Sequence, residues 1–227
     1  MKTSNKILVG LFLLPFLIVL FIDLTLYAKI KKGDYVSVEQ AEIETSISQK
    51  LTPFTDITVD NFTNGRIEIK HSDSFSIRYG KWEKDNIFYE NQNNKLVVMK
   101  SKLNDYGTVT IYCPSFTSLS FNGVEVFVDS MHLGNVTLNV GTDARLEFGA
   151  SAENVVINGK RGAGISFQNN AVIDTLNMHL YNGAEFNKAQ GTIKQAGTIT
   201  LEDSASLNVD GITMRMLMKK TDTTTKQ

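Results

Sequence analysis

Three glutamates in the C-terminal half of the chain have the residue type and the spacing for acid–base chemistry. Glu125, Glu147 and Glu185 each lie within two residues of a Gly or an Ala. Enzymes that hydrolyse glycosidic bonds use two carboxyl groups, which in the inverting type stand about 6.5–9.5 Å apart. On stacked strands, Glu147 and Glu185 would be about 9.6 Å apart with Ser166 between them. We favour the alternative that each glutamate faces water on an alternating strand, and we predict no catalytic residue.

The histidines and the cysteine indicate neither metal nor thiol chemistry. His71, His132 and His179 lie far apart and form no His-x-His or His-x-x-Glu-His cluster, the short spacing that metal sites use. Cys113 is the only cysteine, so it forms no intramolecular disulfide. Residues 108–112 offer no basic partner for a thiolate, and we interpret Cys113 as a buried apolar residue. We predict no metal-binding residue, no cofactor-binding residue and no cofactor.

Four aromatic residues form the candidate binding patch. Tyr79, Trp82, Phe88 and Tyr89 lie within the charged segment RYGKWEKDNIFYE. Exposed aromatic rings stack on sugars or peptides, so a cluster of them would mark a binding surface. The alternative, which we favour, is that these rings close the N-terminal end of a stack of strands.

The elements that would position these residues are short strands that recur with a nearly constant period. Phe148, Phe167 and Phe186 are spaced 19 residues apart, and the segments around them repeat as two short apolar strands joined by turns. A period of about 20 residues built in this way is typical of a β-solenoid, in which each pass of the chain buries its apolar face against its neighbours. The pattern predicts that the three phenylalanines form one internal column. An ordinary β-sandwich with evenly spaced strands is the alternative.

Small residues predict the corners between these strands. The glycine-rich segment 159–164 (GKRGAG) is interpreted as a corner, because no helix follows it to complete a phosphate-binding loop. Corners are also expected at the small residues that precede the second strand of each repeat, which are Ala144, Ala163, Ala184 and Ala205.

The rest of the chain divides around this β domain. From residue 54 onward, alternating runs such as Ile57–Val59 are bounded by turn residues and indicate strands. Within the stalk, residues 38–51 fit either a short helix or a first strand. The predicted fold class is all-β, a β-solenoid preceded by a transmembrane helix. The predicted divisions are a transmembrane anchor at 1–28, a stalk at 29–52, the β domain at 53–213 and a disordered tail at 214–227.

Residues 7–28 are predicted to span a membrane. They include about 20 apolar residues, enough for a helix to cross a hydrocarbon core of about 30 Å. Pro15 is tolerated in such helices, and Asp23 lies near the end, where its carboxylate reaches the headgroups. A cleaved signal peptide is the alternative, but the apolar run is long and Leu26 is too large for a cleavage site after Ala28. Lysines on both sides leave the orientation open.

The stretch from Phe54 to Val209 resembles a known family. Its opening strands Phe54–Val59 and Arg66–Lys70 and its segment Asn94–Val98 are similar to those of the "putative auto-transporter adhesin, head GIN" domain family (domain of unknown function 2807) of Bacteroidetes-type bacteria. Tyr112–Gly123 resembles the Pro-x-apolar-x-x-Leu segment that leads into that family's first coil. Asn-Gly, Thr-Asp and Asp-Ser stand where its corners commonly have Ser-Gly or Gly-Ser. The resemblance implies a right-handed, β-helix-like domain on the non-cytoplasmic side of a membrane and no established activity.

Binding is the expected function. A net charge of −1 and a pI of about 6.3 provide no basic surface for nucleic acid. We expect a single-pass protein of a bacterial membrane whose extracytoplasmic β domain binds a cell-surface protein or a glycan without catalysis. The alternatives are a glycan-processing enzyme and a scaffold that polymerises at the membrane through uncapped apolar ends. No oligomeric state is predicted.

Overall fold

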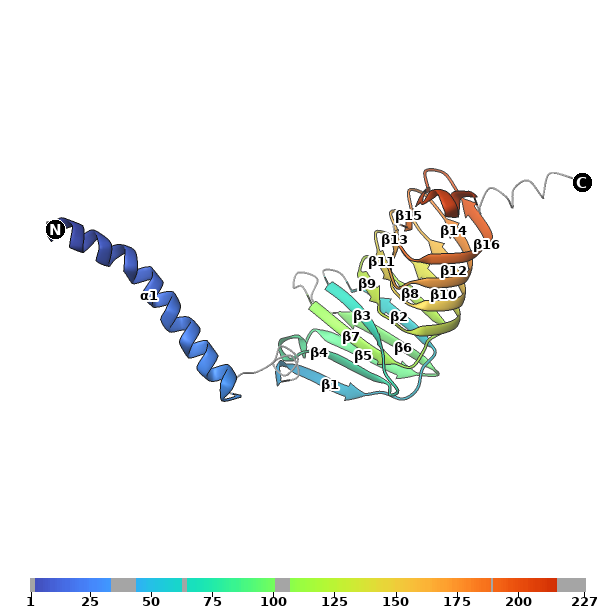
Figure 1. Cartoon of the computed structure of the whole chain (residues 1–227). Helices are drawn as coiled ribbons and strands as arrows, with labels where there is room; N and C mark the ends of the chain where they lie inside the picture. The colour runs from blue at the N-terminus through green and yellow to red at the C-terminus, as the bar shows by residue number, and fades with distance from the viewer. Residues whose placement is uncertain (1–2, 34–43, 63–64, 101–106, 189, 216–227) are drawn as a thin grey trace, which may run out of the picture. The chain divides into compact units, whose positions relative to one another are not determined.

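The chain forms two compact units, residues 1–45 and 46–227. The computed structural model describes residues 3–33, 44–62, 65–100, 107–188 and 190–215, so residues 34–43 of the predicted stalk and most of the predicted tail lie outside the described residues. In the first unit one helix, α1 (Thr3–Lys31), continues through Pro15 and beyond the predicted end of the anchor (Figure 1). Its segment Phe12–Lys31 has a mean hydropathy of 2.0 and is long and apolar enough to cross a membrane.

The second unit is built almost entirely from strands, as the predicted all-β class requires (Figure 1). Its elements are β1 (Ser46–Lys50), β2 (Asp56–Asp60), β3 (Gly65–His71), β4 (Ser76–Gly80), the short helix η1 (Lys81–Glu83), β5 (Ile87–Gln92), β6 (Lys95–Lys100), β7 (Gly107–Cys113), β8 (Ser118–Phe121), β9 (Glu125–Val128), β10 (His132–Val140), β11 (Arg145–Phe148), β12 (Ser151–Gly159), β13 (Gly164–Phe167), β14 (Val172–Leu180), β15 (Glu185–Lys188), β16 (Thr192–Leu201) and β17 (Ser206–Val209). Among the described residues, one sheet has nine strands in the order β1-β4-β7-β3-β9-β11-β13-β15-β17, and the other has eight in the order β16-β14-β12-β10-β8-β2-β6-β5.

From β8 onward the chain alternates between the two sheets, and we call one strand in each sheet, with the corners that join them, a pass. From β10 onward each strand pairs in parallel with the strand one pass earlier, and β8 and β9 pair in parallel with β2 and β3. Buried and exposed residues alternate along these strands, and this alternation sets the register, because a shift by one residue would turn the apolar side chains toward water. In the nine-stranded sheet one outward column consists of Glu125, Arg145, Gly164, Glu185 and Ser206. In the eight-stranded sheet one inward column consists of Leu119, Leu138, Ile157, Met178 and Ile199.

Antiparallel strands close the N-terminal end of both sheets. β2 and β3 lie between β6–β7 on one side and β8–β9 on the other. β4 pairs antiparallel with β7, β1 with β4, and β5 with β6. Ile77 and Tyr79 of β4 and Ile87 of β5 are buried. Residues 46–50, assigned to the stalk by the sequence, therefore belong to the β unit, because β1 pairs along the edge of this cap.

The three phenylalanines meet inside the β unit, but the single register column predicted for them is wrong. Phe148 pairs with Phe167, whereas Phe186 pairs with Ile165. The segment from Ile165 to its register partner Phe186 is two residues longer than the segment from Phe148 to its partner Phe167. Phe186 therefore lies one inward position earlier in its strand than equal spacing would place it. The rings still pack together across the two columns, with centroids 5.7 Å apart for Phe148 and Phe167 and 5.0 Å apart for Phe167 and Phe186.

Small residues occupy the corners, as predicted. Ala144, Ala163 and Ala184 are buried, and each directly follows a residue with a positive φ. These preceding residues are Asp143 (52°), Gly162 (68°) and Gly183 (74°). The left-handed backbone turns the chain within a few residues, and the methyl side chain fits where the turn brings neighbouring passes close together.

A buried lysine marks the C-terminal end of the stack. Lys188 follows Phe186 by one inward position, its side chain is only 8% exposed, and its ammonium group pairs with the carboxylate of Asp210. Asp210 Oδ1 also accepts a hydrogen bond of 2.8 Å from the backbone N–H of Thr213, so it caps the helical turn at residues 211–215. The hydrogen bond from Lys188, with that from Thr213, holds the pKa of Asp210 well below its usual value. The predicted tail at 214–227 therefore begins inside this turn.

Substitution of Phe167 tests the packing of the rings. Phe167→Ala is expected to lower the free energy of unfolding by about 3–5 kcal/mol, because neighbours fill the cavity left by a buried ring only in part. Urea unfolding of the full chain in detergent, followed by circular dichroism, measures the loss. Phe88→Ala is the matched control, since Phe88 is 50% exposed and its loss is expected to stay below about 1 kcal/mol. Equal losses would contradict the packing described.

Substitution of Asp210 tests the ion pair. Asp210→Asn is expected to lower the unfolding temperature at neutral pH, because it leaves the Lys188 ammonium nearly buried without its partner. Since the pKa of Asp210 is lowered, the wild-type advantage is complete above the usual carboxyl value of 3.8 and shrinks as the pH falls below it. Thermal unfolding over this pH range measures the difference. The double variant Lys188→Met with Asp210→Asn should recover much of the loss; a double variant as unstable as the single one would contradict the pairing.

Candidate functional site

A depression on the outward face of the nine-stranded sheet is the candidate binding site. It has a volume of about 410 Å³ and is lined by strands β9, β11, β13 and β15 and by the corners at Gly162 and Gly183. We call it the Gly164 depression. Its polar side chains are Glu125, Arg145, Glu147, Ser166, Glu185 and Asn187.

The depression exists because one outward column lacks a side chain. Gly164 stands in this column between Arg145 on one strand and Glu185 on the other. Because paired strands are about 4.8 Å apart, these two flanking residues stand about 9.6 Å apart. A Cβ built on Gly164 would come no closer than 3.7 Å to Arg145 Cγ, so neighbouring side chains do not fill the space. A glycine at this position leaves a gap one side chain wide.

Carboxylates dominate the rim of the Gly164 depression. Glu147 Oε2 accepts a hydrogen bond of 3.0 Å from Gln168 Nε2. Ser166 is the register partner of both Glu147 and Asn187, which places a hydroxyl and an amide beside a carboxylate. The rim also includes the guanidinium of Arg145, the one basic group among its lining residues. Such a rim suits a ligand that donates several hydrogen bonds through hydroxyl or amino groups.

The three glutamates considered for catalysis all line this depression, but in a different arrangement from the one predicted. Glu125 and Glu185 share a column with Arg145 and Gly164, whereas Glu147 lies in the adjacent column. Glu185 therefore faces Gly164 rather than Ser166. The cause is the longer pass before β15, which also displaced Phe186.

The four aromatic residues of the predicted patch divide between the core and the surface. Tyr79 on β4 is buried, and Tyr89 on β5 packs against the core. Burial raises the pKa of Tyr89, and the neighbouring Tyr79 adds to this shift. Trp82 and Phe88 are 71% and 50% exposed. Alternation along β5 explains why Phe88 and Tyr89 face opposite sides.

A second depression, of about 400 Å³, lies at the opposite corner of the passes. It is lined by His71, Ser130, Met131, His132, Gly149, Ser151 and Asn170. His132 Nδ1 lies 2.9 Å from Ser151 Oγ, and Asn170 Nδ2 donates to Ser130 Oγ at 2.6 Å. The structure thus brings together two histidines that the sequence spacing did not place near one another.

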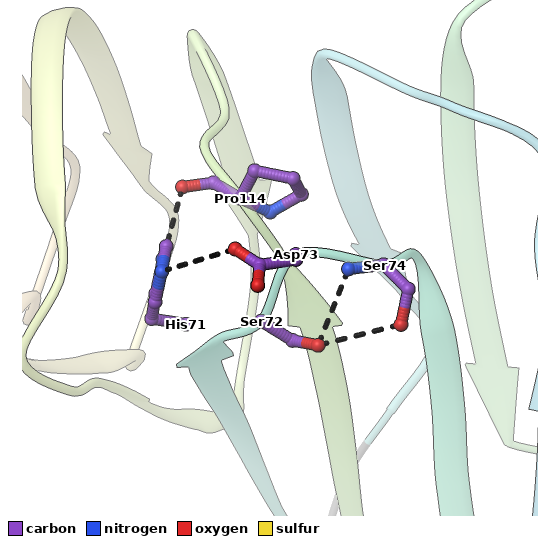
Figure 2. Close-up of polar contacts among 5 residues, drawn as sticks. All are labelled: His71, Ser72, Asp73, Ser74 and Pro114. Carbon is purple, nitrogen blue, oxygen red and sulfur yellow. Dashed lines mark hydrogen bonds and ion pairs between the residues drawn. The ribbon is translucent and has the colours of Figure 1, made fainter.

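Figure 2 shows the surroundings of His71. His71 Nδ1 lies 3.3 Å from the carbonyl oxygen of Pro114, so this nitrogen carries the hydrogen, and Nε2 lies 4.0 Å from Asp73 Oδ1. The hydroxyls of Ser72 and Ser74 contact each other at 3.4 Å, and the backbone N–H of Ser74 donates to Ser72 Oγ. Neither serine is bonded to the imidazole, so the cluster lacks the nucleophile–base contact that serine chemistry requires.

The third histidine takes part in a chain of hydrogen bonds on the eight-stranded sheet. Tyr181 Oη lies 2.8 Å from His179 Nδ1, and His179 Nε2 lies 2.7 Å from Glu202 Oε1. Asn158 Nδ2 donates to Asn139 Oδ1 at 2.8 Å in the neighbouring strands of the same outward column. Within the part of the chain that the structure describes, no group of three or more His, Cys, Asp or Glu side chains is placed to hold a metal ion.

Comparisons with known proteins identify similar structures at low sequence identity. No protein-family model matches the chain, and no curated protein matches it. A "putative adhesin" of Bacteroides fragilis is similar over 72% of this chain and 96% of its own, with 11% identity and a TM-score of 0.41. A "putative lipid binding protein" of Parabacteroides distasonis (73% and 96%, 11% identity, TM-score 0.34) and a "putative cell adhesion protein" of Clostridium sporogenes (72% and 97%, 13% identity, TM-score 0.32) are also similar.

Proposed function

We propose that this protein is a membrane-anchored, adhesin-like binding protein whose β unit lies on the extracytoplasmic side of a bacterial membrane and performs no catalysis. The observation that carries this proposal is the Gly164 depression, an opening in an in-register polar surface where carboxylate, hydroxyl, amide and guanidinium groups converge. Its groups are spaced by strand pairing, so they present fixed hydrogen-bonding partners to a ligand.

The β unit is proposed to be a right-handed β-solenoid of the head GIN type. The parallel pairing of successive passes and their nearly constant length support a solenoid. Both sheets continue through the antiparallel cap, so the cap and the passes form one continuous pair of sheets. The resemblance of Phe54–Val209 to the head GIN family supplies the expected handedness.

Helix α1 is proposed to be an uncleaved anchor. The side chains of residues 12–30 include Phe12, Phe16 and Phe21, all exposed, and an apolar helix of this length is stable in a hydrocarbon layer. Lys29 and Lys31 in its last turn would extend their ammonium groups into the headgroup region.

Binding is favoured over glycan hydrolysis because the carboxylates are not arranged as an isolated pair. Glu125 and Glu185 share their column with the basic Arg145, and Glu147 accepts a hydrogen bond from Gln168. The proposed ligand is a glycan or a cell-surface protein that donates hydroxyl or amino hydrogens to this rim.

The side of the membrane is tested with reporters fused after Gln227. Alkaline phosphatase folds to its active form only outside the cytoplasm, and green fluorescent protein exported in the unfolded state does not fluoresce. We expect an active phosphatase fusion and a dark fluorescent fusion, with the full chain retained in the membrane fraction after carbonate washing. A fluorescent fusion, or release of the chain by carbonate, would contradict the proposed topology or anchor.

The Gly164 depression is tested by filling it. Gly164→Thr places a side chain in the gap without a close contact, because the new Cβ is 3.7 Å from Arg145 Cγ and the φ of Gly164 is not positive. The full chain in detergent is applied to an array of mannose-, galactose- and N-acetylglucosamine-terminated glycans, where we expect the wild type to bind and Gly164→Thr to lose the signal. Gly134→Thr on the other sheet is the matched control, since its Cβ also has room. Equal binding by all three would contradict the site.

A further inference from the structure

Trp82, the only tryptophan of the chain, is held open to solvent at a corner of the β unit. Its side chain is 71% exposed, although tryptophan is on average a well-buried residue. The ring lies against Gly80, because a Cβ built on that glycine would come within 2.5 Å of Trp82 Cε2. The glycine therefore lets the indole lie close to the end of β4, with the rest of its surface toward water.

Two lysines accompany this tryptophan on the short helix η1 and its C-cap. Residues three apart share a face of a 3₁₀-helix, and the backbone N–H of Lys84 lies 3.4 Å from the carbonyl oxygen of Lys81. Both lysines are exposed, as is the carboxylate of Asp85 that follows them, whereas Glu83 is only 2% exposed. We call Lys81, Trp82 and Lys84 the η1 corner.

The residue types of the η1 corner suit the boundary between a membrane and water. Indole rings are enriched at this boundary, because the ring has a large apolar surface and one N–H group that remains hydrated. Lysine side chains lay their apolar stems along such a surface and extend the ammonium group toward the headgroups. Anionic phospholipids attract these ammonium groups. The corner therefore combines an apolar contact with charge complementarity to a phospholipid surface.

The length of chain between α1 and β1 limits how far the η1 corner can lie from a membrane. Ser46, the first residue of β1, pairs with Gly80, so the chain enters the β unit beside Trp82. Gly33 follows α1 and precedes Ser46 by thirteen residues. Because a chain advances at most about 3.6 Å per residue, this distance is at most about 47 Å. The C-terminal end of the stack lies much farther from this point of entry, since β17 is eight strands from β1.

The tether also makes a small contact sufficient. One indole and two lysines would hold a free protein on a membrane only weakly, since stable anchoring takes two signals. A short linker converts the second contact into an intramolecular one, with an effective concentration in the millimolar range. A phospholipid surface close to the end of α1 is therefore the occupant that the η1 corner fits.

We propose that the η1 corner docks on the phospholipid headgroups of the membrane that α1 crosses, with the Trp82 ring in the headgroup layer and the two lysines beside anionic phosphates. The proposal rests on the proposed anchoring by α1. Five strand spacings separate β4 from β13 in the nine-stranded sheet, so the Gly164 depression lies about 24 Å along the sheet from the docked corner. Docking therefore leaves the depression accessible to a ligand.

The fluorescence of Trp82 tests the docking directly, because no other tryptophan contributes to it. The full chain is reconstituted in vesicles of phosphatidylcholine and phosphatidylglycerol, and in vesicles of the same lipids brominated on the acyl carbons nearest the headgroup, which quench a ring by contact. Flotation of the vesicles shows that the chain is incorporated. We expect bromination to lower the emission by about twofold, since an indole at the headgroup level reaches these carbons.

The matched control moves the tryptophan to the other end of the stack. Trp82→Phe combined with Ile212→Trp places the reporter at a position that is 70% exposed. Residue 212 follows β17, which is seven strands from β4, so the two reporters stand about 34 Å apart. Bromination should leave the emission of this variant unchanged. Equal quenching at both positions would overturn the proposal, and circular dichroism confirms that the variant is folded.

The outcomes separate the docking from the anchor. A chain that does not float with the vesicles would overturn the anchor and the docking together. A chain that floats, but whose Trp82 emission does not respond to bromination, would overturn the docking alone. Quenching by acrylamide in the water then distinguishes the cause: a protected ring is covered by protein, either another segment or a second copy, and a quenched ring is open to solvent.

Reversal of one charge tests the part played by the lysines. In the vesicles that contain phosphatidylglycerol, Lys84→Glu is expected to lower the ratio of docked to undocked chains by more than about fivefold, because an ammonium attracted to the anionic surface becomes a repelled carboxylate. Lys95→Glu is the matched control, since Lys95 is exposed and lies at the opposite end of the β5–β6 pair from Ile87 and η1. It should be quenched like the wild type. Equal quenching of the two variants would overturn the proposed contact of Lys84 with anionic headgroups.

Discussion

In-register stacking of parallel strands is the constraint on which the β unit depends. From β8 to β15, each strand lies between an earlier and a later parallel neighbour, so its paired positions are part of columns that run across the sheet. The inward column Leu146, Ile165, Phe186 and Leu207 is apolar throughout. Its burial is shared between passes, since no single pass has enough surface to bury its own apolar face.

Because residues stack in columns, a single unusual residue alters the whole column in which it lies. Gly164 is one missing side chain in an otherwise continuous outward column, and it opens the candidate site. Lys188 is one charged side chain at an inward position, and it requires the carboxylate of Asp210 and hence the final helical turn. In both cases the structural effect of the residue follows from its neighbours in the column rather than from its neighbours in the sequence.

The spacing of apolar residues was sufficient to predict strands, corners and the mostly β class. Ala144, Ala163 and Ala184 were placed at corners because a small residue before a strand signals a tight turn. The register of Phe186 was not predictable from equal spacing, since passes of different length follow one another and a corner absorbs the extra residues. The Gly164 depression depends on that register, so the sequence indicated a corner at 159–164 and not an opening.

Contacts between segments that are distant in the chain were also not predictable from the sequence. β1 reads SISQK, whose weak alternation left a helix and a strand as alternatives; its pairing with β4 decides between them. His71 and His132 share a depression because β6 and β7 are added on one side of β2 and β3 while β8 and β9 are added on the other. That order places the ends of β3 and β9 side by side, although the described sequence between them forms five other strands.

The two ends of the stack differ in how the apolar side chains of the outermost strands are covered. At the N-terminal end the chain reverses direction, and antiparallel strands bring apolar side chains back over the first passes. At the C-terminal end no antiparallel strand is added among the described residues, so β16 and β17 remain edge strands. At the C-terminal end a charge inside the stack interrupts the apolar column: a further pass would have to cover Lys188 and Asp210 and bury their ion pair, which is costly unless every hydrogen bond is satisfied. The ion pair therefore disfavours a further parallel pass at this end, and it holds the turn whose Thr213 lies against Phe186, Ile199 and Val209.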